Sequence, residues 1–143
     1  MRPKFHLAGL VLNFGAYDLT SLPMARNFKE PLVLTPEIMR HFVEAFLPGT
    51  SIEYRKDPSI SPFYKDLRGL KLPSALFACG TSDCLLDDTV MMAVKWQMAG
   101  AEAITRLFPG APHGFTAFPP DKLAAAKDWR EIAQEYLKAK LAA

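Results

Sequence analysis

The sequence predicts an α/β fold in which three parallel strands alternate with helices. Three short apolar runs, at residues 7–14, 75–79 and 103–108, have the length and composition of strands. A segment with helical spacing of apolar residues follows each run, so each strand is connected to the next by a crossover. Strands that alternate with helices in this way are parallel and form one sheet.

The first strand and the helix after it are predicted from apolar residues and breakers. Residues 7–14 are nearly all apolar, which is typical of a strand buried on both faces. Thr35 and Pro36 have the residue types of a helix start. The apolar residues that then recur at helical spacing suit core packing or a lid over an apolar pocket, and they are Ile38, Met39, Phe42, Val43, Phe46 and Leu47.

The second strand, at residues 75–79, precedes a helix that we expect Asp87 or Asp88 to cap and Gly100 to end. One face of this helix is predicted to be apolar, with Trp96 off the stripe; the stripe consists of Val90, Met91, Val94 and Met98.

The third strand, at residues 103–108, contains Arg106, which favours a position at the sheet edge. Asp121 is the expected cap of the last helix. Its predicted apolar stripe consists of Trp129, Ile132, Ala133, Tyr136 and Leu137.

Composition narrows the classes of function. A chain of 143 residues has the size of one domain, so we expect a single domain over residues 1–143. The net charge is +2 and the basic residues are scattered, which argues against binding of nucleic acid. No apolar run has the length of a membrane-spanning helix.

Neither a cofactor nor a metal ion is expected. The glycine motifs of dinucleotide sites and of P-loops do not occur, and the three histidines are far from one another and from the cysteines in sequence. Cys79 and Cys84 fit no disulfide framework, so we expect a reducing compartment, the cytoplasm. Cys79 is predicted to be a small core residue, and Cys84 to be more accessible.

Two residues suited to proton transfer follow the second and third strands. Asp83 lies in the loop after residues 75–79, and His113 lies between Gly110 and Gly114 after residues 103–108. Because the carboxyl ends of parallel strands meet at one edge of a sheet, an acid and a base are expected to meet there. The unperturbed pKa of histidine suits proton transfer near neutral pH, and an aspartate can fix its tautomer.

These motifs resemble the hormone-sensitive-lipase-like branch of the α/β-hydrolases, which are serine esterases and lipases. The similar segments are Asp57-Pro58 with Ser61-Pro62, Leu72-Pro73, Gly80-Thr81-Ser82-Asp83 with Asp87, and Pro109-Gly110-Ala111-Pro112-His113-Gly114-Phe115. The resemblance covers nearly the whole chain. Two positions depart from the family pattern, since Cys84 stands where proline is usual and Leu86 where a basic residue is common.

The resemblance implies that Asp83 is the acid and His113 the base of a Ser-His-Asp triad that hydrolyses a small-molecule carboxylic ester in the intact enzyme. It also implies that residues 19–47 contribute to a cap over the acyl pocket. The apolar residues of this segment suit an acyl group or a core equally, and they are Phe28, Leu32, Met39, Phe42 and Phe46.

The nucleophile that such a triad needs is missing from the sequence. Neither G-x-S-x-G nor a His-Gly-Gly-Gly oxyanion motif occurs. The run Gly80-Thr81-Ser82-Asp83-Cys84 comes near, but its last residue is not glycine, so Ser82 is not expected to be a nucleophile. We therefore expect the C-terminal portion of a longer hydrolase, an incomplete domain that is inactive alone.

An incomplete sheet has a consequence for association. Residues 7–14 would present an unpaired apolar edge, which favours self-association or docking of an N-terminal fragment. Two alternatives stay open. One is a non-catalytic interaction module that uses this edge, and the other is a pseudoenzyme in which Asp83 and His113 have no remaining role.

Overall fold

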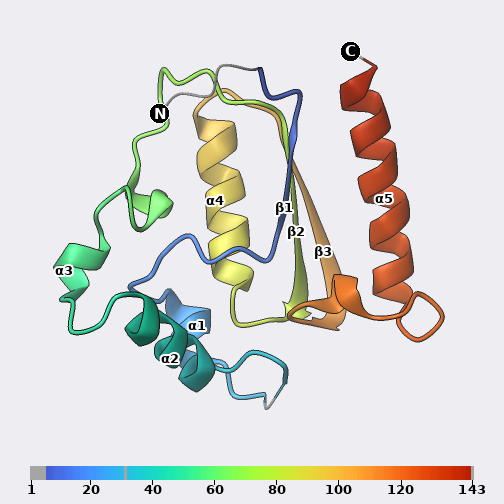
Figure 1. Cartoon of the computed structure of the whole chain (residues 1–143). Helices are drawn as coiled ribbons and strands as arrows, with labels where there is room; N and C mark the ends of the chain where they lie inside the picture. Colours follow the sequence, from blue (N-terminus) through green and yellow to red (C-terminus); the bar gives the residue numbers. More distant parts are fainter. Residues whose placement is uncertain (1–5, 31, 143) are drawn as a thin grey trace.

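The computed structural model describes residues 6–30 and 32–142, so the predicted domain limits at residues 1 and 143 lie outside the described part. Strands and helices follow one another in the order β1, α1, α2, α3, β2, α4, β3, α5 (Figure 1). Their bounds are β1 Leu10–Asn13, α1 Pro23–Asn27, α2 Pro36–Phe46, α3 Ile52–Arg55, β2 Ala75–Ser82, α4 Leu86–Met98, β3 Ala103–Pro112 and α5 Ala124–Leu141.

The three strands form one parallel sheet in the order β1-β2-β3, as predicted. β2 is the central strand, and its residues from Ala75 to Gly80 are buried. β3 forms one edge of the sheet, which confirms the position indicated by the exposed Arg106. β1 pairs with β2 on one side only, within the residues that the structure covers.

Helices cover the two faces of the sheet. Figure 1 shows α4 on one side and α5 on the other. Alternate residues of β2 supply the two cores, because successive side chains of a strand point to opposite faces. One core consists of Leu76, Ala78, Phe108, Ala111, Phe115, Trp129 and Tyr136 on the α5 side. The other consists of Leu67, Ala75, Phe77, Met92, Ala93 and Trp96 on the α4 side.

The strands differ in length from the prediction. β1 is shorter than residues 7–14 and is only half-buried, because it lies at an edge rather than inside the sheet. β2 and β3 each extend into the predicted loops. Gly80 permits this extension, since a Cβ there would collide with the backbone carbonyl of Ala111 on β3.

The predicted apolar face of α4 was wrong. The buried side chains of α4 are those of Asp88, Thr89, Met92, Ala93 and Trp96, and the last three pack in the core against the sheet. Met91, Val94 and Met98 of the predicted stripe are exposed. Apolar residues lie all around α4, so their spacing is compatible with two different apolar stripes. The packing of Trp96 on Phe77 buries the stripe that was not predicted.

The helix starts agree with the prediction in part. Thr35 caps α2 by accepting a hydrogen bond from the amide of Ile38. Neither Asp87 nor Asp121 is a cap, because α4 begins after Leu85 and α5 after Leu123, both without a side-chain cap. The stripe of α5 is confirmed at Trp129 and Tyr136, which are buried, whereas Leu137 is exposed.

No helix within residues 6–30 and 32–142 is both long enough and apolar enough to cross a membrane.

Candidate active site

The carboxyl edge of the sheet brings the two predicted site residues together. Asp83 follows the last residue of β2, and His113 follows the last residue of β3. Asp83 Oδ2 lies 2.9 Å from His113 Nδ1. The meeting of acid and base expected from the two loops is therefore present in the fold.

The carboxylate of Asp83 is held rigidly. Its side chain is fully buried, and its second oxygen, Oδ1, accepts a hydrogen bond from the amide of Leu85 at 2.9 Å. The carbonyl of Asp83 accepts a further bond from the amide of Leu86 as α4 begins. A carboxylate fixed at both oxygens can orient a partner ring without moving itself.

The imidazole of His113 is partly accessible. Its side chain is 25% exposed, whereas that of Asp83 is 0% exposed. Gly114, the next residue, has a φ of 71°, a left-handed conformation that glycine adopts readily. The bond to Asp83 occupies Nδ1, and no hydrogen bond from the described residues occupies Nε2. The arrangement can therefore orient a neutral imidazole whose Nε2 accepts a proton.

The two cysteines near the pair are not activated as nucleophiles. Cys84, which was expected to be accessible, is fully buried beside Leu34 and Met39, so that expectation was wrong. Burial raises the pKa of the Cys84 thiol to about 11, and burial also raises the pKa of Cys79. Both cysteines are free. Near neutral pH both remain protonated thiols, which are poor nucleophiles.

Helices α1 and α2 lie at the carboxyl ends of the strands, on the same side as the acid loop (Figure 1). Leu34, Met39 and Val43 form a buried cluster with Cys84 and Leu85 of that loop. Next to this cluster is an apolar hollow of about 240 Å³, lined by Ala16, Leu19, Met39, Phe42, Val43 and Phe46. Of the residues suited to an acyl group, Met39, Phe42 and Phe46 line the hollow, and Phe28 packs against the cluster.

Two aspartates in the first turn of α4 accept hydrogen bonds from the segment between β1 and α2. Asp88 Oδ1 accepts hydrogen bonds from the amides of Tyr17 and Asp18, at 2.7 and 2.8 Å. Asp87 Oδ2 accepts one from the amide of Met24, at 2.9 Å. Burial raises the pKa of Asp88 to about 6. These aspartates were predicted to be helix caps. A cap and an acceptor for a distant amide need the same residue type, so the sequence does not distinguish the two roles.

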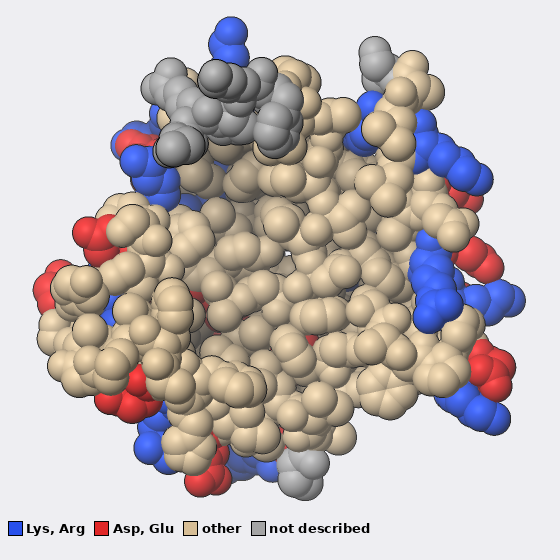
Figure 2. Space-filling view, viewed as in Figure 1, with Lys and Arg blue, Asp and Glu red and all other residues tan. Residues whose placement is uncertain are grey.

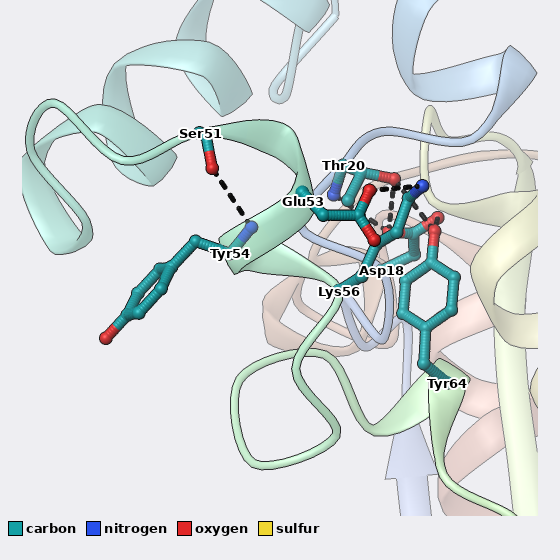
Figure 3. Close-up of polar contacts among 7 residues, drawn as sticks. All are labelled: Asp18, Thr20, Ser51, Glu53, Tyr54, Lys56 and Tyr64. Atoms are coloured by element: carbon teal, nitrogen blue, oxygen red, sulfur yellow. Dashed lines mark hydrogen bonds and ion pairs between the residues drawn. The ribbon is translucent and has the colours of Figure 1, made fainter.

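A second polar cluster surrounds Asp18 (Figure 3). Thr20 Oγ1 donates a hydrogen bond to Asp18 Oδ1 at 2.7 Å, and the hydroxyl of Tyr64 donates one to Oδ2 at 3.2 Å. Lys56, which lies close by in Figure 3, forms an ion pair with Glu53 at 3.0 Å. These bonds satisfy the buried carboxylate of Asp18, so the cluster fixes the turn after β1.

Within the described ranges, no group of three or more histidine, cysteine, aspartate or glutamate side chains is arranged to hold a metal ion.

Comparison with known proteins identifies related chains. A family model described as "alpha/beta hydrolase fold" matches residues 1–117. A protein named "Esterase" from Acinetobacter venetianus is 29% identical over 137 residues, which cover 92% of this chain and 44% of that protein.

Solved structures of similar fold include two from metagenomic libraries. A hormone-sensitive lipase has a TM-score of 0.80 at 29% identity, over 93% of this chain and 43% of the lipase. A thermophilic carboxylesterase has a TM-score of 0.83 at 27% identity, over 94% of this chain and 46% of the carboxylesterase. The chain thus spans less than half the length of each of these relatives.

Proposed function

Because the chain belongs to the α/β-hydrolase fold family, we propose that it supplies the acid and the base of a carboxylic ester hydrolase. The observation that carries the proposal is the contact between Asp83 Oδ2 and His113 Nδ1. Asp83 is the orienting acid and His113 the general base. The curated relative named an esterase supports the class of reaction.

The chemistry follows from the free ring nitrogen. His113 Nε2 takes the proton of a serine hydroxyl as the hydroxyl attacks the ester carbonyl, and then returns it to the departing alcohol. Asp83 keeps Nδ1 protonated and stabilises the imidazolium that forms between the two steps. Each proton moved by the histidine is therefore returned within one half-reaction.

The serine comes from outside these 143 residues, since the sequence lacks the G-x-S-x-G elbow and the oxyanion motif. The chain corresponds to the C-terminal portion of the enzyme, and alone it is inactive. Losing the attacking group and the oxyanion donors together removes the covalent step and its charge stabilisation.

The cap contribution of residues 19–47 defines the substrate class. The apolar hollow between this segment and Ala16 receives the acyl group of a small-molecule carboxylic ester. Free cysteines at positions 79 and 84 support a reducing compartment, the cytoplasm.

The open edge of β1 supports association with a second polypeptide segment. Leu10, Val11 and Leu12 are half-buried and uncharged, and a natural sheet edge is usually protected by charges or prolines. β3 has such protection in Arg106 and Pro109. Figure 2 shows that charged side chains gather at the rim of the face on which β1 lies, and that uncharged residues cover most of its centre. An N-terminal portion of the hydrolase, or a second copy, pairs with β1.

Ester turnover tests the catalytic proposal. The purified chain incubated with a short-chain p-nitrophenyl ester should release no product above background. Turnover that His113→Ala abolishes would contradict the inactive half-site. The intact mass and N-terminal sequence of the native protein then show whether a serine elbow precedes β1. A native protein that begins at Met1 would favour the interaction module.

Sedimentation tests the role of the edge. Val11→Lys places a charge on β1 and should shift the chain toward the monomer, whereas Arg106→Lys on the opposite edge should leave its association unchanged. A parent chain that stays monomeric at high concentration would argue against pairing along β1.

A further inference from the structure

Phe14, the residue after β1, has an unusual backbone. Its φ is 37°, in the left-handed region that bulky side chains rarely adopt. The ladder holds it there, because its amide donates a hydrogen bond to the carbonyl of Ala78 at 2.7 Å. A bulky residue kept in a strained conformation by its surroundings points to a function of its side chain.

The ring of Phe14 contacts the proposed catalytic base. Its centroid lies 4.7 Å from that of His113, with 64° between the planes, and 5.9 Å from that of Phe115. Edge-to-face contacts at these separations are the preferred geometry of aromatic pairs. The left-handed backbone of Phe14 therefore directs its ring to the His113 loop.

The order of the strands shows in which direction the imidazole of His113 extends. His113 follows β3, and β2 separates β3 from β1. To contact Phe14, the imidazole must reach past the end of β2 to the end of β1, which is the open side of the sheet. A serine supplied along that open side would meet the ring there.

A single hydrogen bond does not fix an imidazole. The bond to Asp83 defines one ring atom, Nδ1, but permits the ring to tilt about it. Gly114, directly after His113, also allows other backbone conformations. Contact with the ring of Phe14 restricts the tilt.

We propose that Phe14 is a positioning residue for His113, and that its ring holds the imidazole at the open edge of the sheet with Nε2 free. The catalytic meaning of this inference rests on the proposed function. Its geometric content concerns only this chain and can be measured without any ester turnover.

Nuclear magnetic resonance of the full chain labelled at histidine tests the inference. In the parent, the carbon-bound ring protons of His113 should be shifted by the ring current of Phe14 and show nuclear Overhauser contacts to its ring. In Phe14→Leu this shift should vanish, and exchange of the Nδ1 proton with water should rise by about tenfold as the ring opens more often. Phe14→Tyr should restore the parent signals.

Matched controls separate positioning from general damage. Phe118→Leu removes an exposed aromatic ring from the same loop region and should leave the His113 signals unchanged. The exposed His6 and His41 report any global change. A folded Phe14→Leu chain with parent-like His113 signals would overturn the inference. If that variant does not fold, absent Overhauser contacts in the parent would overturn it equally.

The result of the nuclear magnetic resonance experiment does not depend on whether the proposed function is correct. A His113 that proves unnecessary for ester hydrolysis would remove the catalytic role and leave these signals unaffected. A silent Phe14→Leu substitution would remove the positioning role and leave the assignment of Asp83 and His113 intact.

Discussion

Asp83 and His113 lie 30 residues apart in the chain, and their side chains meet at 2.9 Å. The aspartate is fully buried and the histidine partly exposed. This asymmetry suits a pair in which one member orients and the other reacts, because the orienting group is shielded from solvent and the reacting group is open to it.

Replacing Asp83 by asparagine should uncouple the pair. The amide keeps the shape of the carboxylate, but it no longer presents two charged acceptors, so the Nδ1 tautomer of His113 loses its stabilisation. We expect the Nδ1 proton resonance of the parent to disappear in Asp83→Asn while the circular dichroism of the helices is retained. In a serine-containing assembly the same change should lower kcat by about 10⁴-fold. A retained Nδ1 resonance would show that Asp83 does not set the tautomer.

The left-handed backbone at Phe14 predicts an inverted order of stability for two variants. At an ordinary strand position alanine is more stable than glycine, because glycine loses more conformational entropy on folding. At φ 37° glycine is free of strain, so Phe14→Gly should be more stable than Phe14→Ala by about 1 kcal/mol. Urea denaturation measures both. The ordinary order, with alanine more stable, would mean that Phe14 has no strained backbone in solution.

The raised pKa of Asp88 predicts a loss of stability as the pH rises. Its ordinary value is 3.8 and its value in the fold is about 6, so between these values the folded state binds the proton and the unfolded state does not. The free energy of unfolding should therefore fall from about pH 4 to about pH 6, by about 3 kcal/mol in total. Burial is the main cause, and the neighbouring charges of Asp18 and Asp87 add to it.

Asp88→Asn isolates this contribution. The asparagine oxygen can still accept hydrogen bonds from the amides of Tyr17 and Asp18, but the asparagine side chain does not titrate. The difference in unfolding free energy between variant and parent should increase in favour of the variant from pH 4 to pH 6 and then stay constant. Carboxylates with lowered pKa values, such as Glu44 and Glu102, act in the opposite direction and cancel in this difference. Parallel curves for variant and parent would contradict the raised pKa.

Two adjacent methionines test the orientation of α4. Met92 is buried in the core against the sheet, whereas Met91 is exposed. Met92→Ala should lower the free energy of unfolding by about 2–5 kcal/mol, and Met91→Ala by less than about 0.5 kcal/mol. Thermal or urea unfolding of the two variants gives the comparison. Equal losses would mean that the predicted stripe also packs in solution.

Much of the site could be predicted from the chain because its signals are local. Gly110 and Gly114 around His113, and the strand before Asp83, place both residues at strand ends, and parallel connections bring strand ends together. Asp88 and Phe14 escaped prediction for the opposite reason. Their partners are the amides of Tyr17 and Asp18 and the ring of His113, which are distant in sequence and have no spacing that reveals them.

The sequence by itself determined the alternation of strands and helices, the two residues that we propose as acid and base, and the lack of a serine elbow, since each depends on residue type and short spacing. Only the tertiary structure decided which face of α4 is buried, that Cys84 is inaccessible, and that β1 extends only from Leu10 to Asn13. Those features depend on the volume and backbone partners available around each segment. Close packing on Phe77 selects one helix face over another of similar hydrophobicity.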